Sequence, residues 1–163
     1  LFNDISITDN LLVAIEGSTV TGTLRDLVFP VLNKRERHVS RALEAVGLDV
    51  STKKDTSELS LGQQKLLGVA RALVAEPSLL MLDEPAAGLS SSETEALGRQ
   101  IIDISRTGVS ILLVDHDMDL VLQVCDRIFV LDFGCVIASG TPDEIRSNPA
   151  VIEAYLGAPS EVG

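Results

Sequence analysis

The sequence predicts an α/β fold, a mostly parallel sheet with flanking helices, from two observations. Short apolar runs alternate along the chain with segments of helical periodicity, as they do in α/β proteins. Two of these runs, residues 78–82 and 110–114, are apolar at nearly every position, which suits strands covered on both faces. Residues 127–132 and 135–140 are two further runs joined at 133–134, and they predict an antiparallel hairpin that finishes the sheet.

The first part of the chain, residues 8–47, is expected to be helical with polar residues on the outside. Thr8 precedes a short apolar run that suits the start of a helix. A second helix is predicted over about residues 34–46, because Gly47 is a natural C-terminal cap. Residues 17–33 between them are rich in turn formers and predict no defined element.

From Ser60 onward the helical periodicity becomes regular. A helix is predicted to begin after Ser60 and to end before Pro77, with apolar residues at helical spacing at Leu66, Val69, Ala70 and Leu73. Ser90 and Glu93 are spaced as a capping box and predict a further helix over about residues 91–105. Shorter helices are expected at residues 118–124, after Thr141 and after Asn148.

Composition limits the classes of function. The 163 residues are enough for one domain with a sizeable core, since 45% are hydrophobic and 23% are charged. A formal net charge of −11 disfavours nucleic acid or an anionic membrane surface as a direct partner. No apolar run approaches the ~18 residues of a membrane-spanning helix. Cys125 and Cys135 lack metal-binding spacing and suit reduced thiols of a cytosolic protein, and the start at Leu1 suggests a piece of a longer polypeptide.

The motif LSLGQ at residues 59–63 has two interpretations. Ser60 and Gln63 are spaced as a capping box, so the motif suits an ordinary helix start. The same start presents free N–H groups and the positive end of the helix dipole, and Gly62 lets a phosphate approach the backbone closely. Taken alone, the motif favours the structural interpretation.

Titratable residues follow two of the predicted strands. Asp83 and Glu84 suit a turn at a strand end, but open α/β sheets also bind their ligands at the carboxyl ends of strands. At such a place one carboxylate can hold Mg²⁺ through water while the other orients or deprotonates an attacking water. His116 follows the strand over residues 110–114. It suits a surface or capping position, but it would emerge near Asp83 and Glu84 if the two strands are neighbours.

Taken together and in their order, these motifs resemble the ATP-binding-cassette (ABC) ATPases. Residues 59–63 match the signature motif of that family, residues 79–84 its Walker B strand, residues 87–90 its D-loop, and His116 its switch histidine. The resemblance implies a partial P-loop NTPase (RecA-like) cassette, with a mostly parallel sheet, flanking helices and an α-helical subdomain.

The resemblance also implies a role for each motif. In this family two cassettes enclose two ATP molecules, each held between the phosphate loop of one subunit and the signature of the other. The signature residues that would contact the opposite subunit's ATP are Ser60, Leu61, Gly62 and Gln63. Asp83 would support Mg²⁺ through water, Glu84 would be the general base, and His116 would hold the γ-phosphate and the attacking water. The D-loop residues are Gly88, Leu89 and Ser90, of which Ser90 stands where the family often has aspartate.

Parts of the family pattern are absent from the sequence. None of the twelve glycines begins a G-x-x-x-x-G-K-[ST] phosphate loop, so the cassette lacks Walker A and, by the same comparison, the Q-loop. Residues 1–76 would be the remainder of the helical subdomain, including the signature, and residues 77–163 the C-terminal part of the ATPase core. Without a phosphate loop, the chain is expected to be inactive alone. Uncovered apolar faces and an unpaired strand edge are expected to make it poorly soluble or partly molten.

Within the family, the stretches EPAAGL, HDMDLV and NPAVIEAYLG look like the branched-chain amino-acid importer branch. The implied function is ATP hydrolysis, with ATP and Mg²⁺, coupled to import of branched-chain amino acids or similar small polar solutes. The partners would be a second cassette, identical or paralogous, transmembrane permease subunits and, indirectly, a solute-binding protein, at the cytoplasmic face of the inner or plasma membrane. A lipopolysaccharide-export-type ATPase and a non-catalytic fragment that supplies only a signature stay open. The net charge disfavours a cassette ATPase that acts on DNA or ribosomes.

Overall fold

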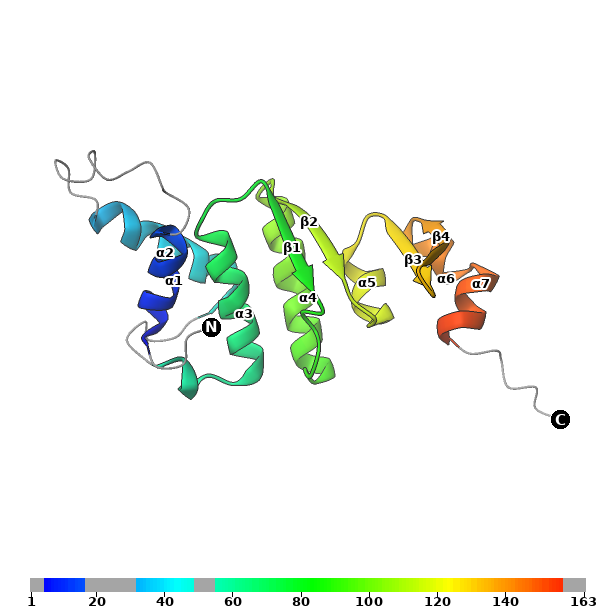
Figure 1. Cartoon of the computed structure of the whole chain (residues 1–163), viewed down its shortest axis with the longest axis horizontal. Helices are drawn as coiled ribbons and strands as arrows, with labels where there is room; N and C mark the ends of the chain where they lie inside the picture. Colours follow the sequence, from blue (N-terminus) through cyan, green and yellow to red (C-terminus); the bar gives the residue numbers. More distant parts are fainter. Residues whose placement is uncertain (1–4, 17–31, 49–54, 157–163) are drawn as a thin grey trace.

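The computed structural model describes residues 5–16, 32–48 and 55–156, so the segment 17–33 lies almost wholly outside the described part. The elements follow one another in chain order along the long axis of the molecule, from the helices near the N-terminus to the C-terminal hairpin (Figure 1). Strands and helices alternate from β1 onward, which confirms the predicted α/β class.

Three helices, α1 (Ile7–Glu16), α2 (Leu32–Ala45) and α3 (Leu61–Leu73), pack against one another at the N-terminal end. Their shared core consists of apolar side chains with almost no exposed surface, among them Ile7, Leu11, Val39, Leu43, Leu67 and Ala70. Burial of such a face, more than helix propensity, stabilises helices of this length.

The predicted boundaries of the first two helices are nearly correct. α1 begins at Ile7 instead of after Thr8, because Ser6 caps it: the backbone N–H of Asp9 donates to Ser6 Oγ at 3.1 Å. α2 ends just before Gly47, as predicted.

Strands β1 (Leu79–Asp83) and β2 (Ser110–Val114) form a parallel pair in which Asp83 lies opposite Val114. Helix α4 (Ser91–Arg106) connects them and covers one face of the pair, so the three elements form a βαβ unit. The side chains of α4 that enter the core are Leu97, Ile101 and Ile104. Because the strands are parallel, their carboxyl ends meet at one edge of the sheet.

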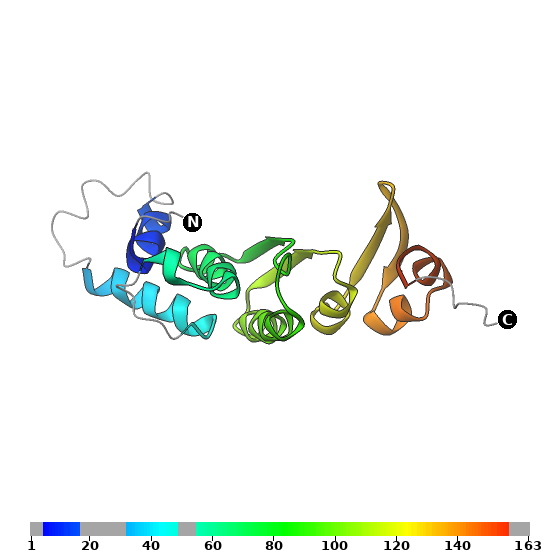
Figure 2. The same cartoon turned by 90° about the horizontal axis from the view of Figure 1, so that it is seen from below.

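The other face of this strand pair is bare. In Figure 2, α4 and α5 lie on one side of β1 and β2, and no described element covers the opposite side. The exposed fractions of the side chains there are 51% for Leu79, 68% for Met81, 48% for Leu112 and 55% for Val114. The prediction that both strands are covered on both faces is therefore wrong for the described residues, whereas the expectation of uncovered apolar faces agrees with this strand pair. An apolar run indicates side chains that avoid water in the folded protein. It does not indicate which element covers them, and no described element covers this face.

The C-terminal part contains an antiparallel hairpin. β3 (Ile128–Asp132) pairs with β4 (Cys135–Gly140) through the turn at 133–134, as predicted, but the hairpin forms its own two-stranded sheet instead of extending the parallel pair. The helical segments around it are α5 (Met118–Val124), α6 (Pro142–Arg146), α7 (Pro149–Val151) and a π-helical turn over Ile152–Leu156. Over the described ranges, no helix combines the length and the apolar character needed to cross a bilayer.

Candidate functional site

The start of α3 has the capping geometry that its sequence predicts. The backbone N–H of Gln63 donates to Ser60 Oγ at 3.2 Å, and the backbone N–H of Ser60 donates to Gln63 Oε1 at 3.0 Å. This reciprocal pair fixes the first turn of the helix at its exposed end. The positive end of the α3 dipole is thereby held in one orientation.

Glu93 lies beside that helix end, although the sequence predicts for it only a capping role on α4. Its Oε2 accepts hydrogen bonds from Ser90 N at 2.9 Å and from Ser90 Oγ at 2.8 Å. These bonds lower the pKa of Glu93, and a weaker contribution comes from the backbone N–H of Gly62. A Cβ at Gly62 would lie 2.8 Å from Glu93 Oε1, so glycine permits this close approach between the starts of α3 and α4.

The segment 87–90 also lies beside the segment 59–63. Gly88 has a φ of +78°, a conformation that favours glycine, and a Cβ there would lie 3.2 Å from Leu61 Cδ2. Leu61 itself is 48% exposed. Residues 59–63 and 87–90, which are separated by more than twenty residues of sequence, therefore lie close together in the structure.

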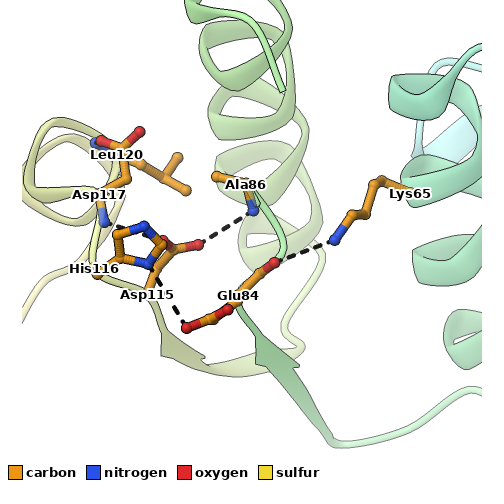
Figure 3. Close-up of polar contacts among 7 residues, drawn as sticks. All are labelled: Lys65, Glu84, Ala86, Asp115, His116, Asp117 and Leu120. Atoms are coloured by element: carbon orange, nitrogen blue, oxygen red, sulfur yellow. Dashed lines mark hydrogen bonds and ion pairs between the residues drawn. The ribbon is translucent and has the colours of Figure 1, made fainter. Parts of the chain in front are cut away.

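Glu84 follows β1 in a left-handed backbone conformation, with a φ of +42°. Its N–H donates to Val114 O at 2.7 Å, and its carbonyl accepts a hydrogen bond from Lys65 Nζ at 3.3 Å (Figure 3). The Glu84 side chain is 58% exposed and stands at the carboxyl end of the strand pair. A non-glycine residue at positive φ at such an edge is a typical feature of functional sites.

The turn after β2 brings His116 to the same edge (Figure 3). His116 Nδ1 lies 3.7 Å from Glu84 Oε1 and 3.7 Å from Asp115 Oδ1. The predicted proximity of His116 and Glu84 is therefore confirmed. The His116 ring is 72% exposed and Asp83 is exposed as well, whereas the Asp115 side chain is fully buried.

Asp115 and Lys65 are site residues that the sequence analysis does not single out. Both act on backbone groups that are distant in sequence: Asp115 Oδ2 accepts from Ala86 N at 3.2 Å, and Lys65 reaches Glu84 O. No spacing rule links residues that are 29 or 19 positions apart in the sequence. Only the arrangement of the elements in space shows that Asp115 and Lys65 belong to the site.

One cavity lies away from this edge, at the C-terminal end of α3. It has a volume of about 570 Å³ and is bordered by the ends of α2, α3 and α4. His38 Nε2 and Glu76 Oε1, 3.2 Å apart, lie at its wall. The polar side chains near Glu84 instead form an open edge, as suits a site completed by another molecule or segment.

Comparison with known families agrees with this geometry. A model described as "ABC transporter" matches residues 1–87, and one described as "Branched-chain amino acid ATP-binding cassette transporter" matches residues 135–161. The high-affinity branched-chain amino acid transport ATP-binding protein LivG of Salmonella typhimurium is 42% identical over 96% of this chain. The corresponding protein BraF of Pseudomonas aeruginosa is 40% identical over 96% of this chain. In both comparisons the chain spans 64% of the relative's length.

Solved structures give the same result for the fold. The ADP conformation of MJ1267, an ATP-binding cassette of an ABC transporter, superposes with a TM-score of 0.79 at 26% identity, covering 96% of this chain and 64% of that one. CbiO1 of Clostridium perfringens, part of the ABC transporter complex cbiONQ, gives 0.77 at 30% identity, covering 94% and 57%. The chain has the α/β fold of P-loop NTPase cassettes, and, because a family model spans more than half of its sequence, it belongs to the ABC transporter family of ATP-binding cassettes.

Proposed function

We propose that this chain supplies the signature, the Walker B carboxylates and the switch histidine of an ATPase that energises import of branched-chain amino acids. One observation carries the proposal: Glu84 and His116, from neighbouring parallel strands, lie 3.7 Å apart at the carboxyl edge of the sheet. The names of the relatives LivG and BraF support the solute class. They favour the importer over the lipopolysaccharide-export alternative.

The signature would serve an ATP molecule held by a second subunit. Ser60, Gly62 and Gln63 stand at the capped, exposed end of α3, where the helix dipole favours a terminal phosphate. Leu61, packed against Gly88, would transmit the position of this end to the D-loop residues Gly88, Leu89 and Ser90. The dimer would be formed with an identical or a paralogous cassette.

Hydrolysis would depend on Glu84 and His116. The Glu84 carboxylate would take a proton from a water whose oxygen attacks the γ-phosphorus, while the bond to the bridging oxygen of ADP breaks. His116 would donate a hydrogen bond to the γ-phosphate and so hold it against the same water. Both side chains are largely exposed in this chain, so water and phosphate can reach them from the open edge.

The donor set at the edge fits Mg²⁺ bound together with a nucleotide. The described residues contain no group of three or more His, Cys, Asp or Glu side chains that could hold a metal by themselves. Mg²⁺ needs no such cage, because one or two carboxylates, waters and phosphate oxygens satisfy it. Asp83, exposed at the end of β1, is the residue that would hold it through water. The metal would neutralise charge that develops on the phosphates.

The domain roles follow from the same comparison. Residues 1–76 would belong to the helical subdomain that docks on transmembrane permease subunits, with a solute-binding protein acting indirectly, at the cytoplasmic face of the membrane. Residues 77–163 would form the C-terminal part of the ATPase core. The bare face of β1 and β2 supports the idea that a complete cassette places a further segment there.

The 163 residues alone are expected not to bind Mg-ATP, because their sequence contains no phosphate loop. Titration calorimetry of Mg-ATP into the isolated chain checks this expectation. Micromolar binding would contradict it.

The proposal is tested in a completed cassette, a chimera in which the N-terminal third of the Salmonella typhimurium LivG relative precedes this chain. We expect the chimera to hydrolyse ATP. Its Glu84→Gln variant, which cannot accept a proton, should retain bound ATP without turnover. Glu95→Gln on α4, an exposed residue 3.9 Å from Arg99, is the matched control and should hydrolyse normally. Undiminished hydrolysis by Glu84→Gln would overturn the assignment of the base.

A further inference from the structure

Asp115 connects the two turns that carry Glu84 and His116. Its side chain is fully buried, and each carboxylate oxygen accepts a hydrogen bond from a backbone N–H (Figure 3). Oδ2 accepts from Ala86 at 3.2 Å, and Oδ1 accepts from Asp117 at 3.0 Å. One carboxylate therefore holds the residue two places after Glu84 and the residue directly after His116.

The bond to Ala86 is important because of Pro85. Proline has no N–H, so the backbone donors nearest to it in the turn are the N–H groups of the residues on either side. The first belongs to Glu84 and donates to Val114 O at 2.7 Å; the second belongs to Ala86 and donates to Asp115. Two adjacent residues, Val114 at the end of β2 and Asp115 directly after it, thus hold the turn on both sides of Pro85.

The backbone conformation of Glu84 depends on hydrogen bonds of this kind. Its φ of +42° is sparsely populated by non-glycine residues, and a conformation of this kind persists only where its surroundings determine it fully. The hydrogen bond from Lys65 Nζ to Glu84 O holds the peptide that follows. Without the Asp115 contact, Ala86 would lose its acceptor and the turn would be free to relax from this conformation.

The other carboxylate oxygen of Asp115, Oδ1, holds the turn that carries His116. By fixing Asp117 N, it orients the peptide that follows His116, and Asp117 Oδ1 in turn accepts from Leu120 N at 3.0 Å at the start of α5. Asp115 Oδ1 also lies 3.7 Å from His116 Nδ1. The turn of His116 is therefore anchored to α5 on one side and to the Glu84 turn on the other.

We infer that Asp115 is a positioning residue, which holds Glu84 and His116 at the separation that hydrolysis requires; the inference rests on the proposed function. A local turn at 115–117 would need only one oxygen and no charge. A fully buried carboxylate is costly to desolvate, and here its second oxygen reaches a residue 29 positions away, on the turn of the proposed base. The hydrogen bonds that connect the two turns account for the buried charge of Asp115.

The first part of the test needs no nucleotide and uses the isotope-labelled 163-residue chain. In Asp115→Asn one oxygen becomes an NH₂ group that faces a donor, so the amide of Ala86 or of Asp117 should exchange with solvent faster, on the order of tenfold. In addition, Glu84→Gln should shift the ring signals of His116 in the wild-type background but not in Asp115→Asn. Asp103→Asn, at an exposed carboxylate 3.0 Å from Arg106, is the matched control and should change neither reading.

The second part measures ATP hydrolysis by the completed cassette. Asp115→Asn should lower kcat by about tenfold to a hundredfold while KM for ATP stays within about twofold, because positioning of this kind acts on the transition state. Asp103→Asn should leave both constants unchanged.

The two parts separate the possible failures. If the wild-type chimera does not hydrolyse ATP, the proposed function fails, and the amide exchange and His116 signals alone decide whether Asp115 joins the turns. If the chimera is active and Asp115→Asn keeps its kcat, the inference is overturned. Unchanged exchange at both amides together with an unchanged His116 response would also overturn it.

Discussion

Met81 and Leu80 are neighbours in β1 but face opposite sides of the strand. Leu80 is 3% exposed and packs on the core with α4, whereas Met81 is 68% exposed on the bare face. In the 163-residue chain, Leu80→Ala should lower the free energy of unfolding by about 2–5 kcal/mol, since it removes buried methylenes and leaves a cavity. Met81→Ala should change it by no more than about 0.5 kcal/mol, because little of that side chain is buried.

The completed cassette should give a different result for Met81. Full burial of a methionine stabilises by about 1.5–3 kcal/mol, and roughly two thirds of this side chain has yet to be covered, so Met81→Ala should cost about 1–2 kcal/mol there. Urea unfolding followed by far-UV circular dichroism measures both variants in both proteins, with equal m-values as the control for two-state behaviour. If Met81→Ala destabilises the 163-residue chain as much as Leu80→Ala, the face is not bare. If it costs nothing in the completed cassette, no segment covers that face.

Three further predictions concern single side chains. Ser60→Ala removes the cap of α3 and should lower the free energy of unfolding by about 1 kcal/mol in urea titration; an unchanged midpoint would contradict the observed capping box. Burial raises the pKa of the Cys125 thiol, and the nearby Asp126 adds to the shift, so iodoacetamide at pH 8 should label exposed Cys135 first; peptide mass spectrometry gives the order. Hydrogen bonds hold the pKa of the Glu93 carboxyl below 4.5. The carboxylate therefore adds to the free energy of unfolding above pH 4.5, and this contribution is lost as the pH falls through the lower pKa of the folded state. The stability difference between wild type and Glu93→Gln should therefore shrink from pH 6 to pH 3, and a constant difference would refute it.

Local signals predicted most of the elements well. The capping box at Ser60 and the prolines after Thr141 and Asn148 fix helix starts through contacts within three residues, and these starts are where the sequence places them. The hairpin turn at 133–134 is also a local feature. The covering of the strands is not local, because periodicity cannot report which element packs on a face. The apolar runs alone predicted strands covered on both faces, and only the resemblance to an incomplete cassette led us to expect uncovered apolar faces.

The candidate site divides in the same way. The meeting of Glu84 and His116 could be predicted, because parallel strands bring their carboxyl ends together. The contributions of Lys65, Asp115 and Glu93 to the site could not be predicted from the sequence. Each depends on a backbone N–H or carbonyl in another element, and the sequence of a segment does not reveal the partners of its backbone groups.

The division of the site between two subunits has the most direct test. Two variants of the completed cassette are prepared: Glu84→Gln, which lacks the base, and Gly62→Asp. The introduced aspartate side chain has to displace the Glu93 carboxylate and places its own carboxylate where the γ-phosphate would bind, while the Ser60–Gln63 cap of α3 does not involve it. Each should be inactive alone. Mixed dimers would pair the intact Glu84 of one subunit with the intact signature of the other, so mixing should restore about a quarter of the wild-type ATPase rate. No recovery in a mixture shown to contain mixed dimers would contradict the claim that Ser60 to Gln63 serve ATP bound to the opposite subunit.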